Sequence, residues 1–215
     1  MKLSSAISRN ALLLGAFATV CTLLITLTWL GTHDHIAAAE LQVRRQALLD
    51  LIPKGEHAND MLQDTLPAAA DGSLLKLKQN RDIYRARNAQ GQVIAVILPV
   101  RAPDGYSGDI NALVAIAADL TVLGVKVISH RETPGLGDKI DTRKSSWIGQ
   151  FTGKNPNNPA PTQWAVQKDG GSFDQLTGAT ISSRAVVNAV RDALQYASDN
   201  YPSLFAQGDT ANVSH

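Results

Sequence analysis

The chain has 215 residues, 20 Lys and Arg against 19 Asp and Glu, and a formal net charge of +1. This length predicts one folded domain with additional segments. The single cysteine excludes an internal disulfide and any four-cysteine zinc or iron–sulfur site within the chain, and no other metal site is expected. Lys2 and Arg9 precede the apolar stretch at 11–31, which leaves 18 basic against 19 acidic residues in the rest of the chain, so there is no electrostatic reason to bind nucleic acid and this class is excluded.

The first predicted element is a transmembrane helix over residues 11–31, a stretch without a charged residue. About 20 apolar residues, rising 1.5 Å each, cross a hydrocarbon core of roughly 30 Å. Its threonine hydroxyls can bond back to carbonyls of the preceding turn, and Trp29 is placed as an interfacial anchor would be. Lys2 and Arg9 favour a cytoplasmic segment over residues 1–10, with the remainder exported.

A cleaved signal peptide is the alternative for this segment, with Lys2 and Arg9 as its basic region and Ala37 to Ala39 as its cleavage site. The apolar run is longer than the roughly 7 to 15 residues of a signal core, which favours a retained helix.

Residues 32–85 are predicted to form a helical linker and the start of the exported domain. Apolar residues at helical spacing predict a helix over residues 36–52, which Pro53 ends. Residues 55–72 are expected to have weak structure, and partial alternation predicts half-exposed strands at 74–78 and 83–87.

The main domain is predicted over residues 86–200, followed by a loose tail over 201–215. Apolar or alternating runs predict three central strands, and short turns between them indicate hairpins. These strands are expected at residues 93–100, 112–118 and 121–130, with turns at 88–91 and 119–120.

A helix over residues 181–196, with Val187, Val190 and Leu194 on one stripe, is expected to pack on the sheet. The expected fold class is therefore α+β: one N-terminal transmembrane helix, then a single domain with a largely antiparallel sheet and packed helices.

The segment from Asp174 to Thr180 directly precedes the last predicted helix. Small residues at Gly178 and Ala179 let backbone N–H groups approach a ligand, and a helix start has free donors that suit a phosphate. Arg184 could add positive charge. The alternative is an ordinary helix start that is capped by the side chain of Thr180 or Ser182.

Two further glycine-flanked segments could embrace a planar ring. Residues 130–137 contain a Pro-Gly turn after the last strand, and residues 105–109 place Tyr106 between glycines. The alternatives are a strand-ending turn with an ordinary surface His130, and an ordinary loop.

Hydrolase and nucleotide-hydrolysing functions find little support. The five histidines form no HExxH pair, and neither a GxSxG elbow nor a GxxxxGK[ST] loop is present. A catalytic triad built on His130 is not indicated, because a chain of this length contains many such triples by chance.

Four motifs, taken in their order along the chain, resemble the FMN-binding family of ion-pumping redox complexes. This family includes the G subunit of the Rnf electron transport complex and the C subunit of the sodium-translocating NADH:quinone reductase. The Rnf type is favoured, because the reductase subunit is usually longer ahead of the flavin loops. The motifs are GYSGDI at 105–110, HRETPGLGDKI at 130–140, Trp147 with FTGK at 151–154, and DQLTGATISSRAV at 174–186.

The resemblance implies that FMN is held covalently, as a phosphoester to Thr180. In the family a separate flavin transferase makes this bond from FAD and recognises the pattern D-x-x-[ST]-G-A-[ST]. Every place of that pattern is filled here, by Asp174, Thr177, Gly178, Ala179 and Thr180.

The resemblance also implies that residues of the other two loops line the isoalloxazine ring, and that Trp147 packs beneath them or serves the core. The ring-lining residues would be Glu132, Thr133, Leu136, Tyr106 and Ser107.

By the same resemblance, the chain is a redox-complex subunit in the bacterial inner membrane, with its flavin domain in the periplasm. It would relay single electrons between other subunits of the complex, and have no independent catalysis. A membrane-tethered sensory or scaffold module, in which Thr180 is only a helix cap, is the alternative. Basic residues at 76, 78, 81, 85 and 87 would form either a docking face or ordinary solvated strand positions.

Overall fold

The structure is a computed structural model that describes residues 2–52, 55–70 and 73–206. It divides into two compact units, residues 1–46 and residues 47–215. Helix α1 (Lys2–Leu49) supplies the first unit, and its last residues, from Ala47, belong to the second unit, which contains the sheet.

Helix α1 contains a segment, Arg9–His33, that is long and apolar enough to cross a membrane, with a mean hydropathy of 2.2. The threonine hydroxyls bond back as expected: Thr19 Oγ1 donates to the Gly15 carbonyl over 2.9 Å and Thr22 Oγ1 to the Ala18 carbonyl over 2.8 Å. The helix continues without a break into the predicted linker helix. It ends at Leu49, ahead of Pro53, which lies outside the described residues.

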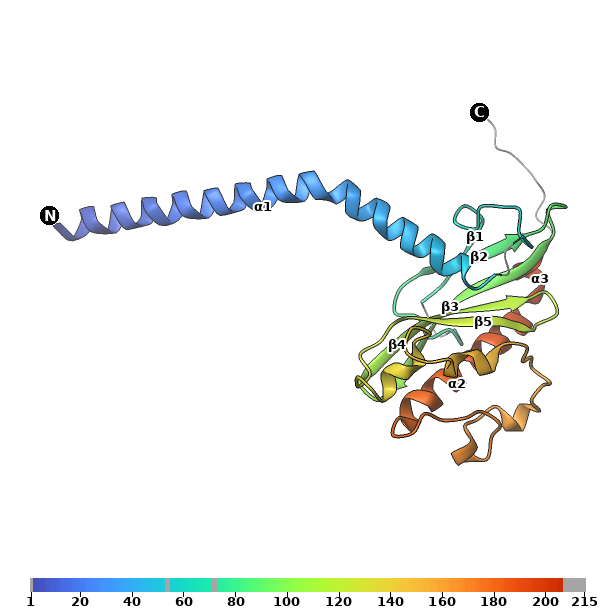
Figure 1. The fold of residues 1–215 in the computed structure, drawn as a ribbon. Helices are drawn as coiled ribbons and strands as arrows, with labels where there is room; N and C mark the ends of the chain where they lie inside the picture. Colours follow the sequence, from blue (N-terminus) through green and yellow to red (C-terminus); the bar gives the residue numbers. More distant parts are fainter. Residues whose placement is uncertain (1, 53–54, 71–72, 207–215) are drawn as a thin grey trace. The chain divides into compact units, whose positions relative to one another are not determined.

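The second unit is built on a five-stranded sheet in which every neighbouring pair is antiparallel (Figure 1). The expected α+β class and antiparallel sheet are thus confirmed. In the sheet order β1-β2-β3-β4-β5, the strands are β1 (Thr65–Ala68), β2 (Arg81–Arg87), β3 (Val93–Gly105), β4 (Gly108–Ala117) and β5 (Val122–Ser129).

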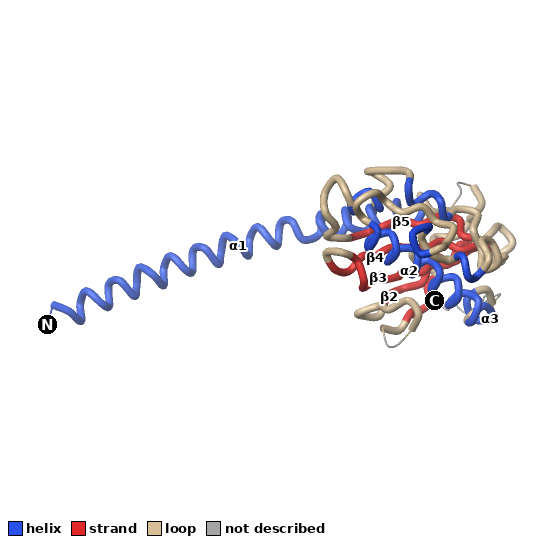
Figure 2. The backbone as a smooth tube through the Cα atoms, turned by 90° about the horizontal axis from the view of Figure 1, so that it is seen from below, coloured by secondary structure: helices blue, strands red, loops and turns tan. Residues whose placement is uncertain are grey.

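Helix α2 (Thr180–Asp199) packs along one face of the sheet, mainly against β3 and β4 (Figures 1 and 2). Between β5 and α2 the chain forms four short 3₁₀ helices, and a one-turn helix follows α2. These are η1 (Gly137–Ile140), η2 (Trp147–Phe151), η3 (Pro161–Gln163), η4 (Gln167–Asp169) and α3 (Tyr201–Leu204).

Strand β3 is buried on both of its faces, which explains its continuous apolar run. Val96 and Leu98 belong to the core cluster that α2 completes, whereas Ala95 and Ile97 lie in a second cluster with Leu48 at the end of α1. A strand covered on one side only would alternate apolar and polar residues.

The strand predicted at 74–78 is wrong, because this segment is a turn. Lys76 has a φ of +52°, outside the extended region, and its N–H donates to the Ser73 carbonyl over 3.0 Å. The alternation in the sequence arises instead because Leu75 and Leu77 are both buried in the main core.

Strand β1 was not expected, because it lies in the segment predicted to have weak structure. It is four residues long, contains Pro67 and pairs only with β2 at the edge of the sheet. An edge strand tolerates proline, since one of its sides needs no ladder hydrogen bonds.

The chain beyond Tyr201 is partly folded, in contrast to the expected loose tail. Helix α3 buries Leu204 in the main core, and only residues 207–215 of the tail lie outside the described residues.

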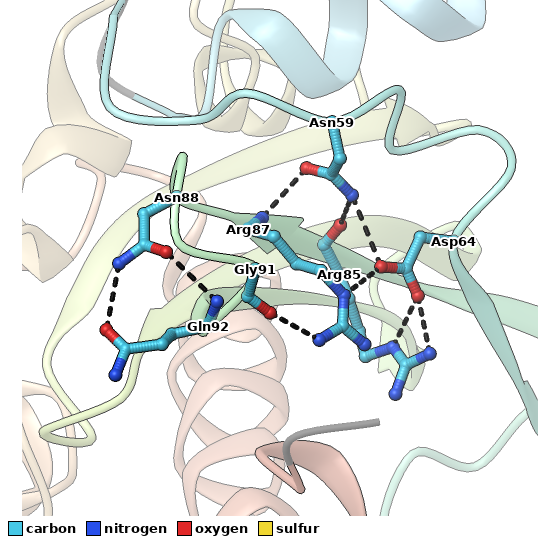
Figure 3. Close-up of polar contacts among 7 residues, drawn as sticks. All are labelled: Asn59, Asp64, Arg85, Arg87, Asn88, Gly91 and Gln92. Carbon is cyan, nitrogen blue, oxygen red and sulfur yellow. Dashed lines mark hydrogen bonds and ion pairs between the residues drawn. The ribbon is translucent and has the colours of Figure 1, made fainter. Parts of the chain in front are cut away.

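A polar network ties the segment ahead of β1 to strand β2 (Figure 3). The Asp64 carboxylate accepts from Arg85 Nε over 2.7 Å and also pairs with Arg87. The Asn59 side chain accepts from the Arg87 N–H over 2.8 Å and donates to the Arg85 carbonyl over 2.9 Å. Asn88 and Gln92 close the adjoining β2–β3 hairpin with a 3.0 Å bond.

We expect Asp64→Ala to lower the free energy of unfolding by roughly 2 kcal/mol, because it leaves two mostly buried guanidinium groups without their shared carboxylate. The side chains involved are only 15–17% exposed. Thermal unfolding of the full chain in detergent measures this effect. Lys78→Ala is the control, since Lys78 is 68% exposed in its pair with Asp109 and should change stability by less than about 0.5 kcal/mol. Equal effects of the two substitutions would contradict this account.

Candidate functional site

The β3–β4 hairpin forms the first of three tight turns. Gly105 and Gly108 pair across its end, so Tyr106 and Ser107 form the tip. Gly108 has a φ of +112°, which only glycine adopts readily. The Tyr106 side chain is 67% exposed. The sequence motif at 105–109 is therefore the tip of a hairpin that presents an aromatic side chain to solvent.

The second turn, Thr133 to Leu136, follows strand β5. The Leu136 N–H donates to the Thr133 carbonyl over 3.2 Å, and Gly135, after Pro134, has a φ of +79°. Proline followed by a glycine with positive φ is the pattern of a type II turn. The predicted Pro-Gly turn is confirmed, and it leaves the Leu136 side chain 44% exposed.

The third turn, Leu176 to Ala179, leads directly into α2. The Ala179 N–H donates to the Leu176 carbonyl over 3.0 Å, and Gly178 has a φ of +78°. Helix α2 begins at Thr180, its N-cap position is Ala179, and no side chain caps it. The expected capping by Thr180 or Ser182 is therefore wrong, because Thr180 already lies in the first helical turn and Ser182 is bonded elsewhere.

The Thr180 hydroxyl has no hydrogen-bond partner among the residues that the structure describes, and its side chain is partly buried. It stands where the backbone N–H groups of the first helical turn lack carbonyl partners. A phosphate ester at this oxygen would meet those donors and the positive end of the helix dipole.

A buried carboxylate, Glu132, connects the first turn to the start of α2. Its Oε1 accepts from the Ser107 N–H over 3.0 Å, and its Oε2 accepts from the Ser182 hydroxyl. Glu132 is 4% exposed and Ser182 is 1% exposed. A Cβ on Gly137 would come within 3.0 Å of both side chains, so only glycine fits beside this contact.

The second and third turns touch each other directly. A Cβ placed on Gly178 would lie 3.2 Å from Leu136 Cδ2, so the leucine packs over the glycine. The structure thus brings together the three segments that the sequence singled out, although they are separated by up to about 70 residues along the chain.

Three large apolar residues in or next to these segments are exposed: Tyr106 in the first turn, Leu136 in the second and Ile181 at the start of α2. Where exposed apolar side chains form a contiguous patch, they mark a site for an apolar ligand or partner. Thr133 and Thr177 are exposed as well. Glu132 differs from these residues because it is buried and both of its carboxylate oxygens accept hydrogen bonds from the protein, one from Ser107 and one from Ser182. Its carboxylate therefore holds the loops together.

Asp174 is exposed but held by three side chains. Its carbonyl accepts from Trp147 Nε1 over 2.8 Å, its N–H donates to Gln150 Oε1 over 2.9 Å, and its carboxylate accepts from Gln167 Nε2 over 2.6 Å. Trp147 also packs edge-on against Phe151 of the core. Trp147 therefore joins the core to the start of the segment that leads into α2.

Arg184 is engaged with Asp169 of η4 through two bonds of 2.6 and 2.8 Å. This guanidinium lowers the pKa of the Asp169 carboxyl below its ordinary value. Arg184 would therefore have to leave or share this pair in order to bind a phosphate.

A cleft of about 430 Å³ is lined in part by Ser107 and Gly108 of the first turn. His130 is one of the lining residues of this cleft. Its Nδ1 accepts a hydrogen bond from the Glu132 N–H over 3.1 Å, so the neutral tautomer with its proton on Nε2 is assigned. The remaining lining residues are Lys78, Asp109, Asn111, Ser129 and Arg131.

Most of the basic residues between 76 and 87 are paired within the domain. Lys76 binds Asp192 over 2.8 Å, Lys78 binds Asp109, and both Arg85 and Arg87 bind Asp64. These internal pairs favour ordinary structural positions over a dedicated docking face.

Sequence reasoning missed the roles of Ser182 and Ser183, which are buried in the first turn of α2. Ser183 lies one helical turn before Val187 on the core-facing stripe, so a polar residue at an apolar position was the available signal. Buried hydroxyls of this kind normally have partners, and both have them here.

Asp141, at the end of η1, gives a pH-dependent prediction. Hydrogen bonds from Arg143 hold its pKa below the ordinary 3.8, although burial opposes them. A lowered folded-state pKa stabilises the fold above pH 3.8, and this contribution is lost as the pH falls through the folded value. Asp141→Asn should therefore destabilise the domain at neutral pH, and by a smaller margin at about pH 3. Melting temperatures at both pH values check this, and a difference independent of pH would contradict it.

Comparison with known proteins supplies two family matches. Residues 1–51 match the RnfG N-terminal region, and residues 105–195 match the FMN-binding domain. The second match begins at the first turn and ends within α2, so it spans all three turns of the site.

Similar curated proteins cover nearly the whole chain. The Pseudomonas aeruginosa protein named as the G subunit of the ion-translocating oxidoreductase complex is 48% identical over 94% of each chain. The Pseudoalteromonas atlantica protein of the same name is 42% identical over 93% of this chain and 92% of its own. Among solved structures, Shewanella oneidensis NqrC has a TM-score of 0.47 and 23% identity over 74% of each chain.

Proposed function

This chain belongs to the family of G subunits of ion-translocating oxidoreductase complexes, and we propose on that premise that it carries FMN covalently on Thr180 and relays electrons within such a complex. The membrane anchor (Arg9–His33) and the flavin domain are the two parts that this function requires. Bound FMN supplies the capacity to accept and release electrons one at a time.

The observation that carries the proposal is the Thr180 hydroxyl. It lies in the first turn of an uncapped helix, and Thr180 is the last residue of a segment, 174–180, that fills the whole D-x-x-[ST]-G-A-[ST] pattern. The small side chains at Gly178 and Ala179 leave room for a phosphate at the helix N-terminus. A flavin transferase would join the FMN half of FAD to Thr180 Oγ1, breaking the pyrophosphate bond and releasing AMP and the hydroxyl proton.

Apolar side chains of the neighbouring turns would pack against the ring of an FMN attached at this point. Leu136 packs over Gly178, two residues before Thr180, and Tyr106 projects from the turn that Glu132 holds in place. In this proposal Tyr106, Ser107, Thr133 and Leu136 line the isoalloxazine ring, and Glu132 fixes the loops that carry them.

We further propose that the chain is anchored in the bacterial inner membrane, with residues 1–10 in the cytoplasm and the flavin domain in the periplasm. Lys2 precedes the apolar span and Arg9 is its first residue, and this basic N-terminal end favours the orientation. A covalent tether would prevent the loss of the cofactor from an exported domain. Other subunits of the complex would supply and accept the electrons.

Mass spectrometry of the full chain, expressed with a flavin transferase, tests the proposal. The expected result is a peptide containing Thr180 that carries FMN less one water. An unmodified peptide, with the transferase shown to be active on a control acceptor, would overturn the covalent linkage and favour a membrane-tethered binding module.

A C-type subunit of a sodium-translocating NADH:quinone reductase is the second candidate. The motifs at 130–140 and 174–186 suit both kinds of subunit. Affinity purification from the native membrane separates the two candidates, because each predicts a different set of co-purifying subunits.

A further inference from the structure

The turn that leads into α2 is held from within the core by one hydroxyl. Ser183 Oγ accepts a hydrogen bond from the Leu176 N–H over 3.0 Å and donates one to the Ala179 carbonyl over 3.0 Å. Ser183 is 0% exposed. Its side chain therefore bridges the first and last residues of the turn that carries Thr177 and Gly178.

We propose that Ser183 is a positioning residue for flavin attachment, which holds this turn in the conformation that the flavin transferase acts on. The inference rests on the proposed attachment at Thr180. Ser183 itself does not contact the reacting oxygen in this proposal; it acts through the backbone of Leu176 and Ala179.

The turn needs such support because few hydrogen bonds within it fix its backbone conformation. One backbone hydrogen bond closes it, from the Ala179 N–H to the Leu176 carbonyl, and Gly178 at its centre is the residue with the widest conformational freedom. The helix N-terminus has no capping side chain that could fix the turn from outside. The Ser183 hydroxyl supplies two further bonds from the inside.

Holding the turn from inside leaves its outer side accessible. Thr177 and Gly178 are exposed, whereas Leu176, Ala179 and Ser183 are buried. A side chain that capped the helix from outside would occupy the donors that a phosphate ester needs. The buried serine therefore orders the turn while the backbone N–H groups at the start of α2 stay available to a phosphate.

The position of Ser183 on the helix also argues for a specific role. It lies on the same stripe as Val187 and Leu194, where an apolar side chain would gain free energy by burial. An Ala at this position would keep the helix and the packing, but it would leave the Leu176 N–H without its partner.

The test compares Ser183→Ala with Val187→Ala in the full chain, purified without flavin and given purified flavin transferase and FAD. Val187 is 0% exposed and lies one turn further along α2, so its truncation weakens the same helix without touching the turn. Below saturating acceptor concentration, Ser183→Ala should lower the initial rate of attachment about tenfold, because the competent conformation is less populated. Val187→Ala should lower the melting temperature and leave that rate unchanged.

Two further measurements make the role specific. Hydrogen exchange of the flavin-free protein should show faster exchange at the Leu176 amide in Ser183→Ala only. Ser183→Thr keeps the hydroxyl but adds a methyl group to a filled site, so it should be destabilised and yet retain most of the attachment rate.

Equal attachment rates for Ser183→Ala and Val187→Ala at the same folded fraction would overturn the inference, even if both variants are unstable. A wild-type protein that takes no flavin would instead overturn the proposed function itself. In that case, the exchange rate at Leu176 still reports whether Ser183 orders the turn.

Discussion

A Thr180→Val variant is expected to carry no covalently bound flavin when it is expressed with an active flavin transferase. Valine matches threonine in shape but lacks the oxygen that a phosphoester requires. Thr180 makes no hydrogen bond to another described residue, so its replacement leaves no polar group unpaired. The fold should therefore change in stability by less than about 1 kcal/mol. In-gel flavin fluorescence and the mass of the Thr180 peptide measure the loss.

Thr177→Val is the matched control, since it makes the same change three residues earlier, in the turn that leads into α2. Thr177 is exposed. In the proposed function it belongs to the pattern that the flavin transferase recognises, but its hydroxyl does not form the phosphoester. Attachment should become slower in this variant while the modified residue stays Thr180. Wild-type flavin content in Thr180→Val would remove the basis of the proposal and return the segment to an ordinary helix start.

The sequence predicted the strands well where their apolar residues are continuous or alternate clearly. The three central strands and α2 are found at the expected places, with ends that differ by a few residues. The errors lie at the sheet edge, where short elements depend on pairing more than on composition. Pro67 is atypical of a strand, so its presence in β1 argued against one. Two buried leucines, two positions apart in the turn at 74–78, gave that segment the alternation that is typical of a strand.

The sequence also indicated which three segments form the candidate site, but not how they are joined. Glycines with positive φ at 108, 135 and 178 mark the turns, and each was visible as a motif. The three segments are joined by the packing of Leu136 over Gly178 and by Glu132, which bonds to Ser107 and to Ser182, 50 positions away. Such long-range pairs have no local signal, so the serine appeared to be a helix cap.

Two different buried side chains hold the loops of the candidate site. Ser183 holds the turn that precedes Thr180, whereas Glu132 holds the hairpin tip through the Ser107 N–H. If the proposed function holds, substitutions in the turn that Ser183 holds should change flavin attachment. Substitutions in the hairpin tip that Glu132 holds should change the surroundings of the ring.

A Gly105→Ala variant tests the hairpin tip and is expected to lower the free energy of unfolding by roughly 3 kcal/mol. The added Cβ would lie 2.3 Å from the Gly108 carbonyl oxygen and 2.9 Å from Glu132 Oε1. The nearer atom belongs to the backbone, so no rotamer change relieves the collision and the hairpin must open. For a domain of this size, such a loss corresponds to a fall in melting temperature of about 6–12 °C.

Gly149→Ala is the control for this substitution, because a Cβ there meets no atom within 4 Å and its φ is not positive. That variant should melt within about 2 °C of the wild type. Because Ser183, and not the hairpin, holds the turn that precedes Thr180, the folded fraction of Gly105→Ala should still accept flavin on Thr180. The emission spectrum of that flavin should change, since the displaced hairpin no longer places Tyr106 at the ring. An unchanged melting temperature would show that the hairpin adapts to the methyl group, and an unchanged spectrum would place the ring away from Tyr106.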